Sequence, residues 1–183
     1  MKKISIVIFT LLLFLSGCGK NKTTYVSDVY PSELLTIENV APYHEYKPEM
    51  TEERSRRMSV ARYQSNPIGQ GDPVIIKVYQ KNGLQSAEQV KAYYDECKTM
   101  RTDSFDVELN ADDAFIAYPT LHYYIDGYHI EITAGSGSDD LQKVLLTNLA
   151  AISIENFTAL TGISAHAEAE IAETSPISDS ESR

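Results

Sequence analysis

Two of the chain's four histidines lie in one short segment, LHYYIDGYHIEIT (121–133), together with one glutamate and three tyrosines. Imidazole nitrogens and carboxylate oxygens are common ligands of zinc in proteins. The same groups act as general acids and bases in catalysis. This segment is therefore the first candidate for a metal or catalytic site, and its chemistry depends on which of its side chains share a face.

The centre of the segment predicts a β-hairpin. Asp126-Gly127 lies between two apolar runs and favours a two-residue type I′ turn, which needs positive φ at both central residues. With this turn, His122 faces Glu131 across the two strands. Because side chains alternate along a strand, one face becomes apolar and forms the predicted core face. That face comprises Leu121, Tyr123, Ile125, Tyr128, Ile130 and Ile132.

The other face of the predicted hairpin carries His122, Tyr124, His129, Glu131 and Thr133. One face of an antiparallel sheet is commonly solvated and polar, so we expect this face to be exposed, with no metal and no cofactor bound. Two alternatives stay open. The face could contact a ligand or a partner, or it could form a metal or catalytic site, although His129 would lie only diagonally across from His122.

Cys97 lies in a segment that predicts a helix from 86 to 100. Ser86 and Gln89 have the spacing of a capping box. The thiol follows two acidic residues near the helix C-terminus, whereas reactive cysteines favour cationic neighbours or a helix N-terminus. We therefore interpret Cys97 as a buried, unreactive thiol.

The rest of the chain predicts an α+β fold. Short connections between strands favour a mostly antiparallel sheet of about five strands, with helices packed on one face. The expected elements are a helix at 32–41, a charged connector at 45–57, strands at 58–65, 73–80, 105–109 and 114–118, the hairpin, and a long helix from 138 that ends by Gly162.

The chain begins with a pattern typical of an export signal. Lys2 and Lys3 precede an apolar run from 4 to 15, which is shorter than the roughly 20 residues of a membrane span. The run ends in Leu15-Ser16-Gly17-Cys18, which resembles the lipobox of bacterial lipoproteins. The resemblance implies that Cys18 receives a diacylglyceryl group, carries fatty-acyl chains such as palmitate, and becomes the N-terminus after cleavage.

These patterns divide the chain into four parts. Residues 1–17 are the predicted signal peptide, 18–27 a lipidated tether, 28–162 a single α+β domain, and 163–183 an acidic tail whose composition predicts disorder. Two or more acyl chains hold a protein stably at a membrane. We therefore expect the domain to be tethered on the outer, extracytoplasmic side of the cell membrane.

The charge of the chain argues against nucleic acid as a partner. The net charge is −10, and loss of Lys2 and Lys3 with the signal peptide would change it to −12. A strongly acidic surface repels the phosphate backbone. The lipid anchor, rather than electrostatic attraction, would then hold the protein at the membrane.

The domain itself resembles small lipoprotein domains of Gram-positive bacteria. The matching residues are Leu34-Leu35-Thr36 and Asp113-Ala114-Phe115, and the chain differs in lacking paired cysteines. The resemblance implies no particular activity.

The aromatic composition gives the remaining functional indication. The chain has twelve tyrosines and no tryptophan, and an outward tyrosine surface suits a protein partner or a cell-wall polymer. We expect a non-catalytic binding or accessory module. The alternative is a surface hydrolase or metal-dependent enzyme that uses His122, His129 and Glu131.

Overall fold

The computed structural model describes residues 29–55, 57–65, 71–80 and 85–163. The signal peptide, Cys18 and the tether lie outside these ranges, as does all but the first residue of the acidic tail. Their assignments therefore stay predictions from the sequence.

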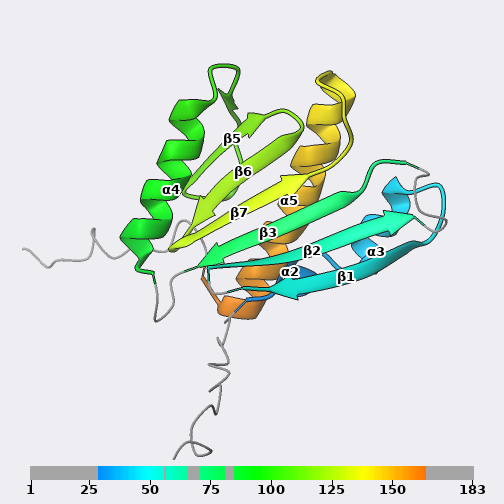
Figure 1. The fold of residues 1–183 in the computed structure, drawn as a ribbon, viewed down its shortest axis with the longest axis horizontal. Coiled ribbons are helices and arrows are strands. Elements are labelled where there is room, and N and C mark those ends of the chain that lie inside the picture. The colour runs from blue at the N-terminus through cyan, green and yellow to red at the C-terminus, as the bar shows by residue number, and fades with distance from the viewer. Residues whose placement is uncertain (1–28, 56, 66–70, 81–84, 164–183) are drawn as a thin grey trace, which may run out of the picture.

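The described residues form one sheet in which every neighbouring pair of strands is antiparallel. The order across the sheet is β1-β2-β3-β7-β6-β5-β4 (Figure 1). The strands are β1 (Pro48–Arg54), β2 (Met58–Ser65), β3 (Val74–Gln80), β4 (Phe105–Asp106), β5 (Asp113–Ala117), β6 (Thr120–Ile125) and β7 (Tyr128–Thr133).

The prediction of about five strands was too low, since the sheet has seven. The main reason is β1, whose sequence PEMTEER was interpreted as a connector because of its charge. It instead pairs along its whole length with β2, from Pro48 opposite Ser65 to Arg54 opposite Ser59. β1 is an edge strand, where charged side chains are common because they discourage pairing with other chains.

The helices are α2 (Pro31–Leu34), α3 (Ile37–Val40), the 3₁₀ turn η1 (Ala41–Tyr43), α4 (Ala87–Met100) and α5 (Asp140–Thr161). The predicted helix at 32–41 is thus split into two short helices. The start of α4 agrees with the predicted capping box. The Ser86 hydroxyl accepts from the backbone N–H of Gln89, and the Gln89 side chain accepts from the N–H of Ser86.

The main core lies between one face of the sheet and the helices α2, α3 and α5. From the hairpin it takes the six residues of the predicted core face, and from α5 it takes Leu146, Leu149, Ala150, Ile154 and Phe157. The hydroxyls of Tyr123 and Ser153 lie 2.7 Å apart inside this core and join β6 to α5.

Among the described residues, α5 is the one helix long and apolar enough to cross a membrane by length and composition. Here it packs along the sheet, and its C-terminal end is Gly162 with φ of 71°, as the sequence predicts. We interpret α5 as the core helix of the domain.

Helix α4 covers the opposite face of the sheet from α5 (Figure 1). It packs on β3, β6 and β7, and its Tyr94 joins Phe115 and Ala117 of β5 in a second apolar cluster. The expectation that all helices pack on one face was therefore wrong. Strand β5 is buried on both faces from Ala114 to Ala117 because it lies between the two layers.

Candidate functional site

The hairpin has the register that the sequence predicts. Asp126 and Gly127 have φ of 44° and 83°, as a type I′ turn requires. His122 lies opposite Glu131, and Tyr124 lies opposite His129. The side chains therefore alternate between faces as expected.

The expectation that the polar face is exposed to solvent was wrong. Only 5% of His122, none of His129 and 5% of Glu131 is exposed. The physical reason is α4, which lies over this part of the sheet and excludes water from it. Two imidazoles and a carboxylate are thus buried inside the protein. Burial of such groups costs free energy unless they are paired, hydrogen-bonded or bound to a metal.

Three atoms of these side chains that could bind a metal ion lie close together. His122 Nδ1 lies 3.1 Å from His129 Nε2, 3.8 Å from Glu131 Oε1, and the distance from His129 Nε2 to Glu131 Oε1 is 3.9 Å. The hairpin register explains this convergence, since His122 and Glu131 are directly opposite and His129 lies two residues from Glu131 on the same strand.

Helix α4 and strand β3 complete this group. Cys97 of α4 is half-buried, and its sulfur lies within 4.8 Å of a donor atom of both His122 and Glu131. Lys77 of β3 lies opposite Glu131, and its Nζ is 2.8 Å from Glu131 Oε2. We call Lys77, Cys97, His122, His129 and Glu131 the buried polar cluster.

Aromatic rings hold both imidazoles in place. His122 stacks on Phe115, with ring centroids 4.5 Å apart and an angle of 4° between the planes. His129 stacks on Tyr79 at 5.1 Å and 19°, and meets the edge of Tyr94 at 5.1 Å. The outer nitrogens, Nε2 of His122 and Nδ1 of His129, have no hydrogen-bond partner among the described residues.

Burial determines the charge states of the cluster. Loss of hydration lowers the pKa of His122 to about 4 and that of His129 to about 3, the latter helped by the repulsion between the two imidazoles. Both rings are therefore neutral at pH 7. Burial also raises the pKa of the Cys97 thiol, which agrees with the interpretation of an unreactive thiol.

Tyr124, the fourth predicted site residue, does not join the cluster. It is half-buried at the edge of α4, where its ring centroid lies 5.7 Å from that of Tyr94 and the Lys91 ammonium lies 5.4 Å from its ring. The structure thus brings together His122, His129 and Glu131 and separates Tyr124 from them.

Sequence reasoning did not connect Cys97 and Lys77 with the hairpin. The sequence predicted a helix over 86–100 with a buried thiol at Cys97, but it did not indicate which face of the sheet this helix covers. The sequence of β5 did indicate that a second layer covers this face of the sheet. Its run Ala114–Ala117 is apolar throughout and does not alternate with polar residues. Such runs are typical of strands buried on both faces.

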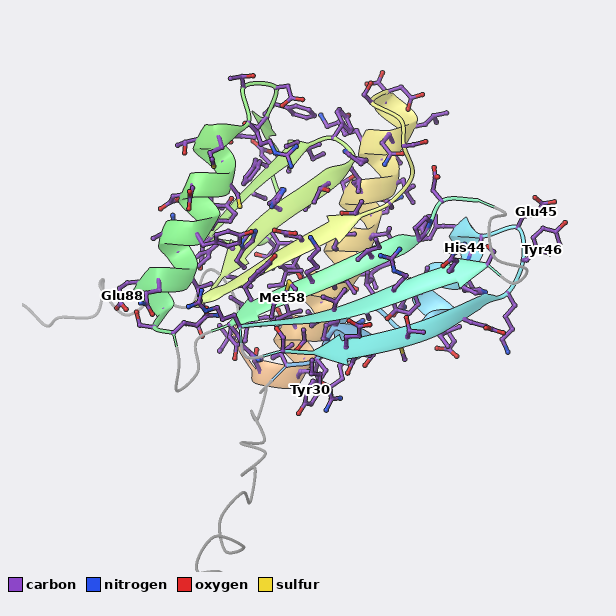
Figure 2. All side chains as sticks on the ribbon, viewed as in Figure 1. Tyr30, His44, Glu45, Tyr46, Met58 and Glu88 are labelled. Carbon is purple, nitrogen blue, oxygen red and sulfur yellow. The ribbon has the colours of Figure 1, made fainter. Side chains whose placement is uncertain are left out.

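A pocket of about 390 Å³ opens beside the cluster, where β2 and α4 begin and β3 ends. Its lining residues are Arg57, Tyr79, Gln85, Gln89, Val90 and Tyr93. In Figure 2, Glu88 marks the end of the molecule where α4 begins, and His44 and Tyr46 lie at the opposite end.

Two tyrosines separate this pocket from the buried polar cluster. The rings of Tyr79 and Tyr93 lie 5.0 Å apart, and each also contacts the His129 ring, at 5.1 and 5.6 Å. Tyr93 is 39% exposed. Gln85 joins the walls of the pocket by donating to the carbonyls of Arg57 and Gln80.

The chain matches no protein-family model, no curated protein and no solved structure. Function is therefore inferred from the residues of this chain. They form two separate features. One is the open pocket lined by tyrosines, and the other is the buried polar cluster, whose side chains are of the types that bind metal ions.

Proposed function

We propose that this protein is a lipid-anchored, extracytoplasmic binding module without catalytic activity. The lipobox-like Leu15-Ser16-Gly17-Cys18 supports the anchor. The pocket beside α4 is the observation that carries the binding role. It combines two tyrosine rings with a guanidinium and two side-chain amides, and such a mixture of apolar surface and convergent polar groups is typical of binding sites.

The chemistry of the pocket favours a protein segment or a cell-wall polymer as the partner. Tyrosine provides a rigid apolar surface with a polar tip, which suits both sugar rings and peptide side chains. Arg57 can pair with a carboxylate through its planar donors. The net charge of −10 disfavours nucleic acid.

The buried polar cluster offers little support for the alternative of a surface hydrolase. An enzyme site needs a nucleophile or an activated water that the substrate can reach. His129 has no exposed surface, and α4 separates His122 and Glu131 from solvent. The raised pKa of Cys97 also opposes a thiolate nucleophile.

The binding role is testable by sedimentation of the detergent-solubilised full chain with purified cell-wall sacculi. Tyr93→Ala should weaken binding about tenfold, because loss of a central aromatic side chain commonly costs more than 1 kcal/mol. Tyr46→Ala is the matched control, since Tyr46 is 41% exposed and lies at the other end of the molecule (Figure 2).

The same two variants test a protein partner by pull-down from membrane extracts. A partner that Tyr93→Ala loses and Tyr46→Ala retains would support the pocket as the binding site. If neither sacculi nor membrane proteins bind in a manner that depends on Tyr93, the proposed binding role is wrong.

A further inference from the structure

We propose that the buried polar cluster is a zinc site in which His122 Nδ1, His129 Nε2, Glu131 Oε1 and Cys97 Sγ bind one ion. This site is distinct from the tyrosine-lined pocket, and it does not depend on the proposed binding role. It would fix α4 to the sheet through the metal.

The spacing of the donor atoms is the main evidence. Zinc binds nitrogen and oxygen at about 2.0–2.2 Å and sulfur at about 2.3 Å with tetrahedral geometry, so its ligand atoms lie about 3.3–3.6 Å from one another. The three hairpin atoms are 3.1, 3.8 and 3.9 Å apart. One ion can therefore contact all three with shifts of a few tenths of an ångström.

Cys97 supplies the fourth ligand from α4. Its sulfur lies within 4.8 Å of one ligand atom of His122 and one of Glu131, and the thiol is half-buried. The side chain of Cys97 would have to shift further to share the ion with His129, which does not belong to that group of close ligand atoms. A thiol that binds zinc loses its proton. Here that proton passes to solvent and the metal–sulfur bond forms, which overcomes the raised pKa of the metal-free thiol.

The surroundings hold the ligands in the required orientation. Zinc-bound histidines commonly donate their other ring N–H to a carboxylate or a carbonyl. Here the stacked rings of Phe115 and Tyr79 fix the two imidazoles instead. Lys77 binds Oε2 of Glu131 and so leaves Oε1 directed at the other donors.

The ligand set selects a class of metal. Two imidazoles and a thiolate favour zinc and similar transition metals over Ca²⁺ and Mg²⁺, which prefer oxygen ligands only. The charge of the site is also acceptable. Zn²⁺ with the Glu131 carboxylate and the Cys97 thiolate is neutral, and Lys77 adds one positive charge at the side.

The test is a titration of the full chain, purified in detergent and treated with a chelator, with Co²⁺ followed by Zn²⁺. Wild type should bind one Co²⁺ with the intense visible bands of tetrahedral cobalt and a near-ultraviolet thiolate-to-cobalt band, and Zn²⁺ should remove both. Cys97→Ser should lose the thiolate band and keep weaker visible bands.

Two histidine variants complete the test. His122→Gln should weaken Zn²⁺ binding more than about 100-fold, beyond the usual effect of losing an outer-shell partner. His44→Gln is the control and should bind like wild type, since His44 contacts Ser65 at the other end of the molecule (Figure 2).

Absence of tetrahedral Co²⁺ binding in wild type would overturn the inference and leave the two imidazoles as a simple hydrogen-bonded pair. An unchanged thiolate band in Cys97→Ser would also overturn it. Cys97→Ser changes one atom of a half-buried side chain, so this result stays decisive even if His122→Gln does not fold.

Discussion

His129 has no exposed surface, and its ring lies among those of Tyr79, Tyr93, Tyr94 and His122. A charged imidazolium there would lose its hydration without a close anionic partner, because Glu131 is 3.9 Å away and already paired with Lys77. At the scale of single residues, the domain therefore folds around neutral histidines.

This arrangement makes the metal-free protein sensitive to acid. The folded-state pKa values of about 4 for His122 and about 3 for His129 lie below the ordinary 6.5 of an unfolded chain. The unfolded state therefore binds more protons than the folded state below pH 6.5, and the free energy of unfolding falls as the pH falls. Each histidine contributes a slope of up to about 1.4 kcal/mol per pH unit.

Urea unfolding between pH 6.5 and pH 5, with a chelator present, measures this slope. This range lies above the titration of most carboxylates, so the histidines dominate it. The double variant His122→Gln, His129→Gln should have a much flatter dependence. A wild-type free energy of unfolding that stays constant across this range would show that the histidines are not buried as the structure has them.

The turn of the hairpin was predictable from the sequence, whereas the burial of its polar face was not. Asp126-Gly127 determined the turn, and the turn determined which side chains share a face, because both are local effects. Whether the polar face meets water is not local. It depends on where α4 packs, some thirty residues away in sequence, and a face with two histidines and a glutamate has the composition of an exposed one.

Among the helices and strands, α4 has the largest effect on the site, because it covers the polar face of the hairpin and buries its histidines and glutamate. Its length and its Ser86 cap were predictable from local spacing. Its position on the sheet was not, because an amphipathic helix can cover either face. β1 was missed for a similar reason, since its pairing with β2, rather than its own charged sequence, makes it a strand.

Two adjacent tyrosines of α4 test this packing. Tyr94 is fully buried against Phe115 and His129, whereas Tyr93 is 39% exposed. Tyr94→Ala should lower the free energy of unfolding by about 3–5 kcal/mol, as loss of a large buried ring commonly does. Tyr93→Ala should cost far less, because much of its ring already meets water.

Chemical denaturation of the two single variants provides the comparison. Equal losses of stability, or a larger loss for Tyr93→Ala, would mean that α4 does not lie on the sheet in this orientation. The proposed zinc site would then lose Cys97, its fourth ligand, as well.

At the scale of the whole molecule, one sheet is covered by α5, α2 and α3 on one face and partly by α4 on the other (Figure 1). The pocket lies at the exposed end of α4, so it is accessible to a large partner. The net charge of −10 provides no attraction to an anionic membrane surface. The proposed localisation at a membrane would therefore require the proposed lipid anchor at Cys18.

Metabolic labelling with a fatty-acid analogue tests this anchor most directly. If the thiol of Cys18 receives the lipid, as we propose, wild type should incorporate the label and fractionate with membranes. Cys18→Ala should carry no label, whereas the control Cys97→Ala should be labelled like wild type. Label retained in Cys18→Ala, or absent from wild type, would contradict the account of a lipid-anchored binding module.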